Sequence, residues 1–198
     1  MLKKKGKLII ISSPSGAGKT TITKKLVSLK KNIELSVSVT TRKPRANEIN
    51  NKDYIFVDLK TFKNFLKKKS FIEHAKVFGN YYGTLKKNIK SKIKENKKII
   101  LDIDWQGARQ IKKKLPKDII TIFILPPSLQ ELKKRLSKRE RNLKFINLRM
   151  SKAKKEITHW KEYDYVVVNN DLNKCVNEIK KIIYFNDFKP LNSNISLI

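Results

Sequence analysis

The stretch Leu8-Ile9-Ile10-Ile11-Ser12-Ser13-Pro14-Ser15-Gly16-Ala17-Gly18-Lys19-Thr20-Thr21 decides how this chain folds. A short apolar run bounded by turn residues is typical of a buried parallel strand. A loop of small residues follows, and the segment after it has helical periodicity, with Ile22, Leu26 and Leu29 on one face. Strand, small-residue loop, Lys-Thr and helix is the context of a phosphate-binding P-loop. The alternative is a strand-to-helix turn that merely contains Gly-Lys-Thr.

The P-loop interpretation assigns a task to each end of the loop. The loop amides and the helix N-terminus would hold phosphate oxygens. Lys19 would reach the β and γ phosphates, and the Thr20 hydroxyl would bind Mg²⁺. One position departs from the pattern, because Ser13 stands where a glycine is usual. Serine fits there only if the backbone angles are open to an L-residue.

The rest of the chain alternates between predicted strands and predicted helices. Further buried strands are expected at 99–104, 121–125 and 165–168, and helices at 87–96, 105–115, from 128 towards 139, and from 148 to 160. Asp171 is expected to cap a last helix. This alternation predicts an α/β fold, a P-loop three-layer core with a parallel sheet, which binds ligands at the carboxyl ends of its strands.

Two segments fall outside this alternation. Residues 36 to about 86 combine short strands with a helix near 59–69, which indicates an inserted mixed α+β lobe. Residues 138–147 are charged with little periodicity and are expected to form an exposed loop. Trp105 and Trp160 are interpreted as core residues, and Cys175 as part of the packing of the last helix.

Composition limits the class of protein. The chain has 198 residues, of which 39% are hydrophobic and 32% charged, as in a soluble globular protein. No apolar run is long enough to span a membrane, and the first one is too short and strand-like for a signal peptide. The single cysteine excludes an intrachain disulfide and a cysteine-based metal cluster. We therefore expect a cytoplasmic location and no membrane partner.

The formal net charge of +30 raises the question of a polyanionic partner. A nucleic-acid groove usually enlists arginine for bidentate and stacking contacts. Here most basic residues are lysines spread over helices and loops, and arginine occurs only at 42, 45, 109, 135, 139, 141 and 149. The lysines are therefore interpreted as a general surface bias, and a nucleic-acid partner is not expected.

Two pairs of charged residues point to chemistry on phosphates. Asp102 and Asp104 end a predicted strand two residues apart, so both can face one site and hold hydrated Mg²⁺; capping of the next helix is the alternative. Arg42 and Arg45 flank Pro44, and their fork geometry suits a second phosphate; a solvated turn is the alternative. Arginines also bracket the charged loop, as a lid over a transferring phosphoryl group requires: Arg135, Arg139 and Arg149.

Seven further stretches resemble the guanylate kinase family, and the similarity runs from about residue 7 to 183. They are Ser-Val-Ser-Val-Thr-Thr-Arg-Lys-Pro-Arg (36–45), Lys-Asp-Tyr (52–54), Phe-Ile-Glu-His-Ala (71–75), Gly-Asn-Tyr-Tyr-Gly-Thr (79–84), Ile-Leu-Asp-Ile-Asp-Trp-Gln-Gly-Ala (100–108), Leu-Pro-Pro-Ser (125–128) and Tyr-Asp-Tyr-Val-Val-Val-Asn (163–169).

This resemblance implies reversible transfer of the ATP γ-phosphoryl group to GMP or dGMP, with Mg²⁺ as cofactor, in purine nucleotide metabolism. The implied ATP-binding residues are Ser13, Pro14, Ser15, Gly16, Ala17, Gly18, Lys19, Thr20, Thr21 and Asn169. The implied GMP-binding residues are Ser38, Arg42, Arg45, Tyr54, Glu73, Tyr82, Thr84 and Asp104, of which Glu73, Thr84 and Asp104 read guanine. The implied catalytic residues are Lys19, Arg42, Arg135, Arg139 and Arg149, and the implied metal ligands are Thr20 and, through water, Asp102.

The resemblance also implies a division of the chain within one domain of about residues 7–185. The P-loop core would comprise 1–35, 87–137 and 149–185, the GMP-binding lobe 36–86, the lid 138–148 and the C-terminal tail 186–198. Three positions depart from the family pattern: Ser13, a lid without its usual glycine and acidic run, and Asn170 in place of an aspartate.

Three other interpretations remain. A binding module that has lost catalysis need not keep Lys19, Thr20 and Asp102, yet all three are present. An RNA-associated P-loop protein is suggested only by charge. A kinase for another nucleoside monophosphate would not need acidic groups facing the N1–H and N2 donors of guanine.

Overall fold

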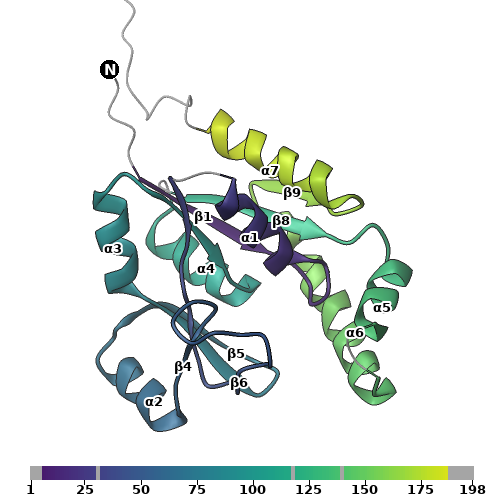
Figure 1. Ribbon diagram of the computed structural model, residues 1–198, viewed down its shortest axis with the longest axis horizontal. Helices are drawn as coiled ribbons and strands as arrows, with labels where there is room; N and C mark the ends of the chain where they lie inside the picture. Colours follow the sequence, from purple (N-terminus) through teal and green to yellow (C-terminus); the bar gives the residue numbers. More distant parts are fainter. Residues whose placement is uncertain (1–5, 30–31, 117–118, 139–140, 187–198) are drawn as a thin grey trace, which may run out of the picture.

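The computed structural model describes residues 6–29, 32–116, 119–138 and 141–186 (Figure 1). Its centre is a parallel sheet of five strands in the order β2-β7-β1-β8-β9. Their bounds are β1 Lys7–Ser12, β2 Ile33–Leu35, β7 Lys98–Asp102, β8 Ile119–Leu125 and β9 Tyr165–Val168. The central strand β1 pairs with β7 on one side and β8 on the other, so it is buried along its length.

Helices cover both faces of this sheet. On one face Ile9 and Ile11 pack with α1 (Lys19–Ser28) and α7 (Leu172–Phe185). On the other, Leu8 and Ile10 pack with α3 (Lys86–Lys94) and α4 (Trp105–Lys114). Successive strand residues point to opposite faces, so one apolar run builds both cores. The predicted three-layer α/β fold is confirmed.

A second sheet forms the core of the inserted segment. Its strands are β3 Val39–Thr40, β4 Ile55–Phe56, β5 Phe71–Val77 and β6 Asn80–Leu85, in the order β4-β3-β6-β5. The helix α2 (Leu59–Lys67) packs against it through Phe62, which stacks on Phe71 with ring centroids 4.7 Å apart. We call residues 36–86, which contain this unit, the acceptor lobe, after the role that the family resemblance implies for them. In Figure 1 it lies below the main sheet.

A helical pair lies at the carboxyl side of the main sheet. The helix α5 (Leu129–Ser137) begins after Ser128, where a helix was predicted to start, and the Ser128 hydroxyl accepts the Glu131 N–H. The helix α6 (Leu143–Ile157) packs on α5 around Leu132, Leu136 and Ala153 and continues into the 3₁₀ helix η1 (Thr158–Glu162).

The structure corrects several boundaries. The charged loop was predicted to reach residue 147, but α6 begins at Leu143, because Asn142 accepts the Lys144 N–H at 3.0 Å and starts the helix. In the first turn of α6 only Ile146 is buried, whereas Leu143 is 71% and Phe145 53% exposed, so this turn has little apolar periodicity. Trp160, predicted to be in the core, is 39% exposed on η1, whereas Cys175 is buried as expected.

The strand predicted for 99–104 ends at Asp102, and Asp104 caps α4 instead by accepting the Gly107 N–H at 3.0 Å. The expectation that Asp102 and Asp104 face one site because they lie two residues apart on one strand therefore does not apply. The strand β2 was not predicted, because three residues are too few to show a pattern. Among the described helices, none is long and apolar enough to cross a membrane.

Candidate active site

A cavity of about 250 Å³ opens where β1 and β7 end. It lies between the P-loop, the acceptor lobe and α6. Most of the residues predicted from the sequence line it: Ser13, Pro14, Ser15, Gly16, Gly18, Lys19, Thr20, Thr21, Ser38, Arg45, Tyr54, Glu73, Tyr82, Asp102, Asp104 and Arg149. Segments far apart in the chain therefore meet at one place.

The P-loop backbone is shaped by two glycines. Gly16 and Gly18 have φ angles of 93° and 97°, in the left-handed region that side chains disfavour. At Gly18 an added Cβ would also lie 2.6 Å from Nδ2 of Asn169. That amide donates a hydrogen bond of 2.7 Å to the Ala17 carbonyl. Asn169, predicted to bind ATP, thus supports the loop from behind.

The unusual residue at the start of the loop fits without strain. Among the described residues, positive φ outside glycine occurs at Asn51, Lys69, Phe78 and Asn96, and Ser13 is not one of them. Its backbone conformation is therefore open to any L-residue. The Ser13 hydroxyl donates to the Pro14 carbonyl at 3.1 Å, so the side chain is used within the loop.

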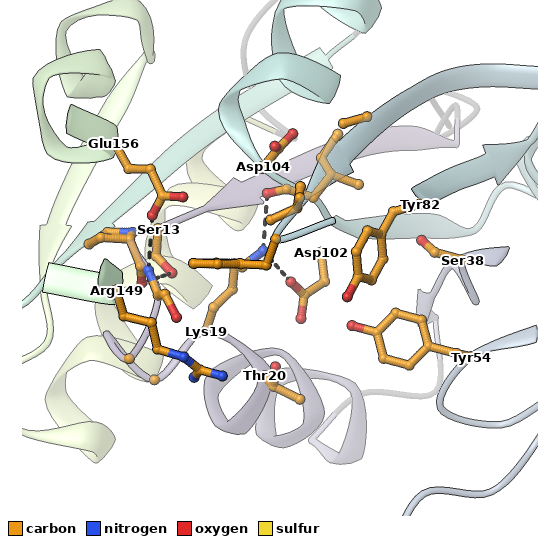
Figure 2. Close-up of a pocket in the computed structure, with 18 of the residues that line it drawn as sticks. Ser13, Lys19, Thr20, Ser38, Tyr54, Tyr82, Asp102, Asp104, Arg149 and Glu156 are labelled. Atoms are coloured by element: carbon orange, nitrogen blue, oxygen red, sulfur yellow. Dashed lines mark hydrogen bonds and ion pairs between the residues drawn. The ribbon is translucent and has the colours of Figure 1, made fainter. Parts of the chain in front are cut away.

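Lys19 and Asp102 form the centre of the cavity (Figure 2). Lys19 Nζ lies 2.5 Å from Asp102 Oδ1 and donates to the Ile103 carbonyl at 3.1 Å. Both side chains are largely buried, at 18% and 14% exposure. The P-loop lysine is therefore neutralised by the acid at the end of β7.

The residues predicted to hold Mg²⁺ fit the ion in part. Thr20 and Asp102 both line the cavity and offer the oxygen donors that Mg²⁺ prefers. Within the described residues, no group of three His, Cys, Asp or Glu side chains could bind a metal by itself. An ion with one carboxylate, one hydroxyl and nucleotide phosphates as ligands matches how Mg²⁺ usually binds beside substrate phosphates.

The opposite wall of the cavity comes from the acceptor lobe. Figure 2 shows Ser38, Tyr54 and Tyr82 on one side of Lys19, with Arg149 and Glu156 on the other. The rings of Tyr54 and Tyr82 meet edge to face, with centroids 6.1 Å apart. Burial raises the pKa of Tyr54 well above its ordinary value of 10.0, so its phenol remains a hydrogen-bond donor.

The two arginines of the lobe have different environments. Arg45 lines the cavity and its side chain is 67% exposed. Arg42 does not line the cavity: one guanidinium nitrogen donates to both carboxylate oxygens of Glu48, at 2.8 and 2.9 Å, and the group lies 5.3 Å from the Tyr54 ring centroid. Glu48 also accepts the Arg45 N–H at 2.9 Å, so one carboxylate orders the whole turn.

The acceptor lobe also contributes a buried carboxylate to the cavity. Glu73 is only 3% exposed and accepts a hydrogen bond of 2.6 Å from Thr84, whose hydroxyl lies 3.4 Å from that of Ser38. Burial raises the pKa of Glu73 to about 7, and the charge of Asp104 adds to the shift. Only glycine fits beside it at position 107, where a Cβ would lie 2.4 Å from Glu73 Oε2.

The remaining predicted residues lie near the cavity but not in it. Arg135 donates to the Asn169 carbonyl at 3.2 Å, and both line a second cavity of about 300 Å³ behind Gly16, Gly18 and Thr21. Ala17 is buried beneath the loop. Thr84 does not line the cavity but donates its hydroxyl to Glu73. Arg139 lies outside the described residues.

Six residues that line the cavity were not predicted from the sequence, and two of them, Glu156 and Phe78, make contacts that matter for the site. Glu156 of α6 lines the cavity and accepts the Ser15 N–H at 3.1 Å, and burial raises its pKa. It follows Arg149 by seven residues, so both side chains lie on one helix face, a spacing that could have drawn attention to it. Phe78 sits in the turn between β5 and β6 and also lines the cavity.

A P-loop facing a second wall of hydroxyls, arginines and a buried acid defines a class of protein: a phosphotransferase with separate donor and acceptor sites, as in nucleoside monophosphate kinases. Comparison with known proteins narrows this class. The family model of guanylate kinases matches residues 5–185. The chain belongs to the guanylate kinase family, and this membership implies ATP-dependent phosphorylation of GMP to GDP.

Individual relatives agree with the family match. The chain is 44% identical over 190 residues to the guanylate kinase of Maricaulis maris, covering 96% of this chain and 87% of that protein. It is 47% identical over 182 residues to that of Rickettsia prowazekii, covering 91% and 92%. The crystal structure of the guanylate kinase from Anaplasma phagocytophilum superposes with a TM-score of 0.81 at 37% identity, covering 95% of this chain and 89% of that one.

Proposed function

We propose that the cavity transfers the γ-phosphoryl group of ATP to GMP, and more slowly to dGMP, with the P-loop side holding the donor and the acceptor lobe holding the monophosphate. The observation that carries this assignment is that one cavity joins the P-loop with Lys19 to a wall that holds Arg45 and the buried Glu73. Cations on both sides can hold two phosphates, and a buried carboxylate can accept hydrogen bonds from a guanine base.

On the donor side the loop amides and Lys19 would receive the β and γ phosphates. Lys19 would exchange its contact with Asp102 for the phosphate oxygens, which is a short movement for a flexible side chain. Thr20 and, through water, Asp102 would hold Mg²⁺, which would supply positive charge beside the phosphates. Asp102 would thus be paired in both states, first with Lys19 and then near the ion.

On the acceptor side the GMP phosphate would meet Ser38, Tyr54, Tyr82 and the arginines of the lobe. Tyr54 and Tyr82 present phenol groups to the cavity, and Arg45 is exposed enough to turn towards a ligand. Arg42 would need to share its guanidinium between Glu48 and the phosphate, and five N–H donors make that possible. These hydroxyls and cations would fix the phosphate that attacks.

The base would be read by acidic oxygens. Guanine presents N1–H and N2 donors on one edge, where adenine presents an acceptor at N1. Glu73 has one oxygen held by Thr84, and Asp104 accepts from Gly107 and Gln106, so both carboxylates are oriented before the base arrives. An oriented acceptor pair would favour guanine because adenine would leave it unsatisfied.

Transfer itself would depend on alignment and on exclusion of water. The protein does little covalent chemistry in such a reaction, because positioning and charge stabilisation supply the rate. Arg149, with Arg135 and Arg139, would neutralise the transferring group, and the segments 36–86 and 138–148 would close over the substrates. A cytosolic location remains a prediction of the sequence.

An ADP-release assay with different acceptors tests the proposal. GMP should support the fastest release and dGMP a slower one, whereas AMP, UMP and dTMP should be poor acceptors. ATP turnover that is equal with and without GMP would contradict the reaction. A chain that binds GMP but never releases ADP would instead be a binding module.

A further inference from the structure

The turn between β5 and β6 has an unexpected residue at its centre. Phe78 and Gly79 have φ angles of 48° and 82°, so both central residues of this two-residue hairpin are left-handed. Such turns favour asparagine, aspartate and glycine, and a bulky aromatic residue is a genuine outlier at positive φ. Nothing lies within 4 Å of a Cβ placed at Gly79, so crowding does not impose this arrangement. Strain of this kind is often kept where a side chain is needed.

The ring of Phe78 contacts two cations of α6. Lys152 Nζ lies 4.1 Å from the ring centroid and Arg149 Cζ lies 5.7 Å from it, both within the range of a cation–π interaction. The two cations are three residues apart and share one helix face. Phe78 and Arg149 also line the same cavity. The unusual residue therefore connects the acceptor lobe to the helix that carries Arg149.

The rest of α6 is attached to the donor side. Ala153 packs on Leu132 and Leu136 of α5, and Glu156 accepts the Ser15 N–H of the P-loop. The helix thus touches the P-loop near its C-terminal end and the lobe near its middle. Arg149 lies on the side of the helix that faces the lobe, so its guanidinium is placed by the ring contact as well as by the helix.

We propose that Phe78 is a positioning residue that holds Arg149 over the cavity when the acceptor lobe is in place. This rests on the proposed function, in which Arg149 neutralises the transferring group. A group that acts on the transition state must be aligned within a fraction of an ångström, so a loss of the ring contact should lower kcat more than it raises either KM. The contact also couples the two halves of the site: the lobe that holds GMP helps to place an arginine that acts on the ATP phosphate.

Two variants separate the ring from the strain. Phe78→Asn removes the ring and suits a left-handed turn, so its melting temperature should be equal to or above that of the wild type. Phe78→Leu removes the π face but keeps an apolar side chain in the strained conformation. Both should lower kcat by about tenfold, with KM for ATP and GMP within about threefold, because alignment is lost while the binding groups remain. Phe78→Tyr keeps the ring and should retain kcat within about twofold.

Lys69→Asn is the matched control. Lys69 also has positive φ, 50°, but it is exposed in the lobe after α2, and asparagine should relieve the turn there without changing kcat. A drop in kcat in Lys69→Asn would show that relief of a left-handed turn in the lobe lowers kcat by itself. The effect of Phe78→Asn would then not require the loss of the ring, which contradicts the proposal.

A double-mutant cycle gives the deciding measurement. In an Arg149→Ala background, followed at high enzyme concentration, Phe78→Asn should cause no further loss, because the group it positions is absent. The same tenfold loss in both backgrounds, or full activity of Phe78→Asn in the wild-type background, would overturn the inference. A wild-type protein without GMP-dependent ADP release would contradict the proposed function itself.

Discussion

The two halves of the cavity are built in different ways. The donor half is mostly backbone: two left-handed glycines within three residues shape the P-loop, which lines the cavity at the start of α1. One contiguous stretch of sequence therefore contains most of its geometry. Its main cation, Lys19, comes from the same stretch.

The acceptor half is mostly side chains. Its wall collects Ser38, Tyr54, Glu73 and Tyr82 from four separate places in the chain, and two of them, Ser38 and Tyr54, lie just before the two-residue strands β3 and β4. Each functional group depends on a partner: Arg42 on Glu48, and Glu73 on Thr84. Its geometry thus exists only after the lobe has folded.

This contrast predicts how substitutions act in each half. In the donor half, removing a side chain should affect chemistry and leave the loop intact, because backbone angles hold the loop. In the acceptor half, a substitution should alter selectivity and stability together, because the same buried groups serve both.

Lys19→Ala should reduce GMP phosphorylation by about 10³-fold or more while the protein still folds, because a cation beside the transferring group is lost and the glycines remain. ADP release and circular dichroism measure the two effects. Lys25→Ala is the control, since Lys25 lies on the same helix and its amine contacts Asn173 of α7, away from the cavity, so the rate should stay within about twofold. An undiminished rate in Lys19→Ala would exclude the P-loop role.

Glu73→Gln should lower the preference for GMP over AMP by about 10²-fold, because glutamine turns a donor towards the guanine N1–H and leaves it unsatisfied. Ratios of kcat/KM for the two acceptors measure this change. Unchanged selectivity would remove Glu73 from base recognition.

The same variant tests how Glu73 is coupled to folding. Its pKa rises from 4.5 to about 7 in the folded protein, so its contribution to stability is complete below pH 4.5 and is lost as the pH rises through 7. That shift corresponds to roughly 3 kcal/mol. Urea unfolding should therefore show that the free energy of unfolding falls more between pH 5 and pH 8 in the wild type than in Glu73→Gln. An equal fall in both proteins would assign the pH dependence to other groups.

The same contrast explains what could be predicted from the sequence. The strand, loop and helix around Lys19 are contiguous in the sequence, so hydrophobic periodicity and the glycines were sufficient to predict the P-loop. The core fold was predicted from the alternation of strands and helices. Local patterns indicated Arg42, Arg45 and Asp104, whereas Tyr54 and Glu73 were assigned only through family resemblance because they carry no local signal. Glu156 and Phe78 were missed because a lone glutamate on a polar helix and a lone phenylalanine before glycine look ordinary, and their contacts arise only when α6 meets the loop and the lobe.

Glu156→Ala should raise KM for ATP by about fivefold, because the Ser15 amide loses the acceptor that orders it. Glu156→Gln should stay within about twofold of the wild type, since its amide oxygen can accept the same hydrogen bond. Lys155→Ala, at an exposed neighbouring position, controls for changes in α6 itself. If Glu156→Gln were as impaired as Glu156→Ala, the charge and not the hydrogen bond would be responsible.

Ser13→Gly should have the smallest effect, and it shows how far the backbone alone determines the donor half. Ser13 does not have a positive φ, so glycine relieves no strain there. The unfolded chain gains freedom, which should cost about 0.5–1 kcal/mol of stability, and the lost contact to the Pro14 carbonyl lies within the loop. KM for ATP should remain within about twofold in an ATP titration. Gly18→Ala is the opposite case, because φ is 97° and the new Cβ would meet Asn169, so ATP binding should collapse. A large change in ATP affinity for Ser13→Gly would mean that the serine side chain, and not only the loop backbone, sets how the donor is held.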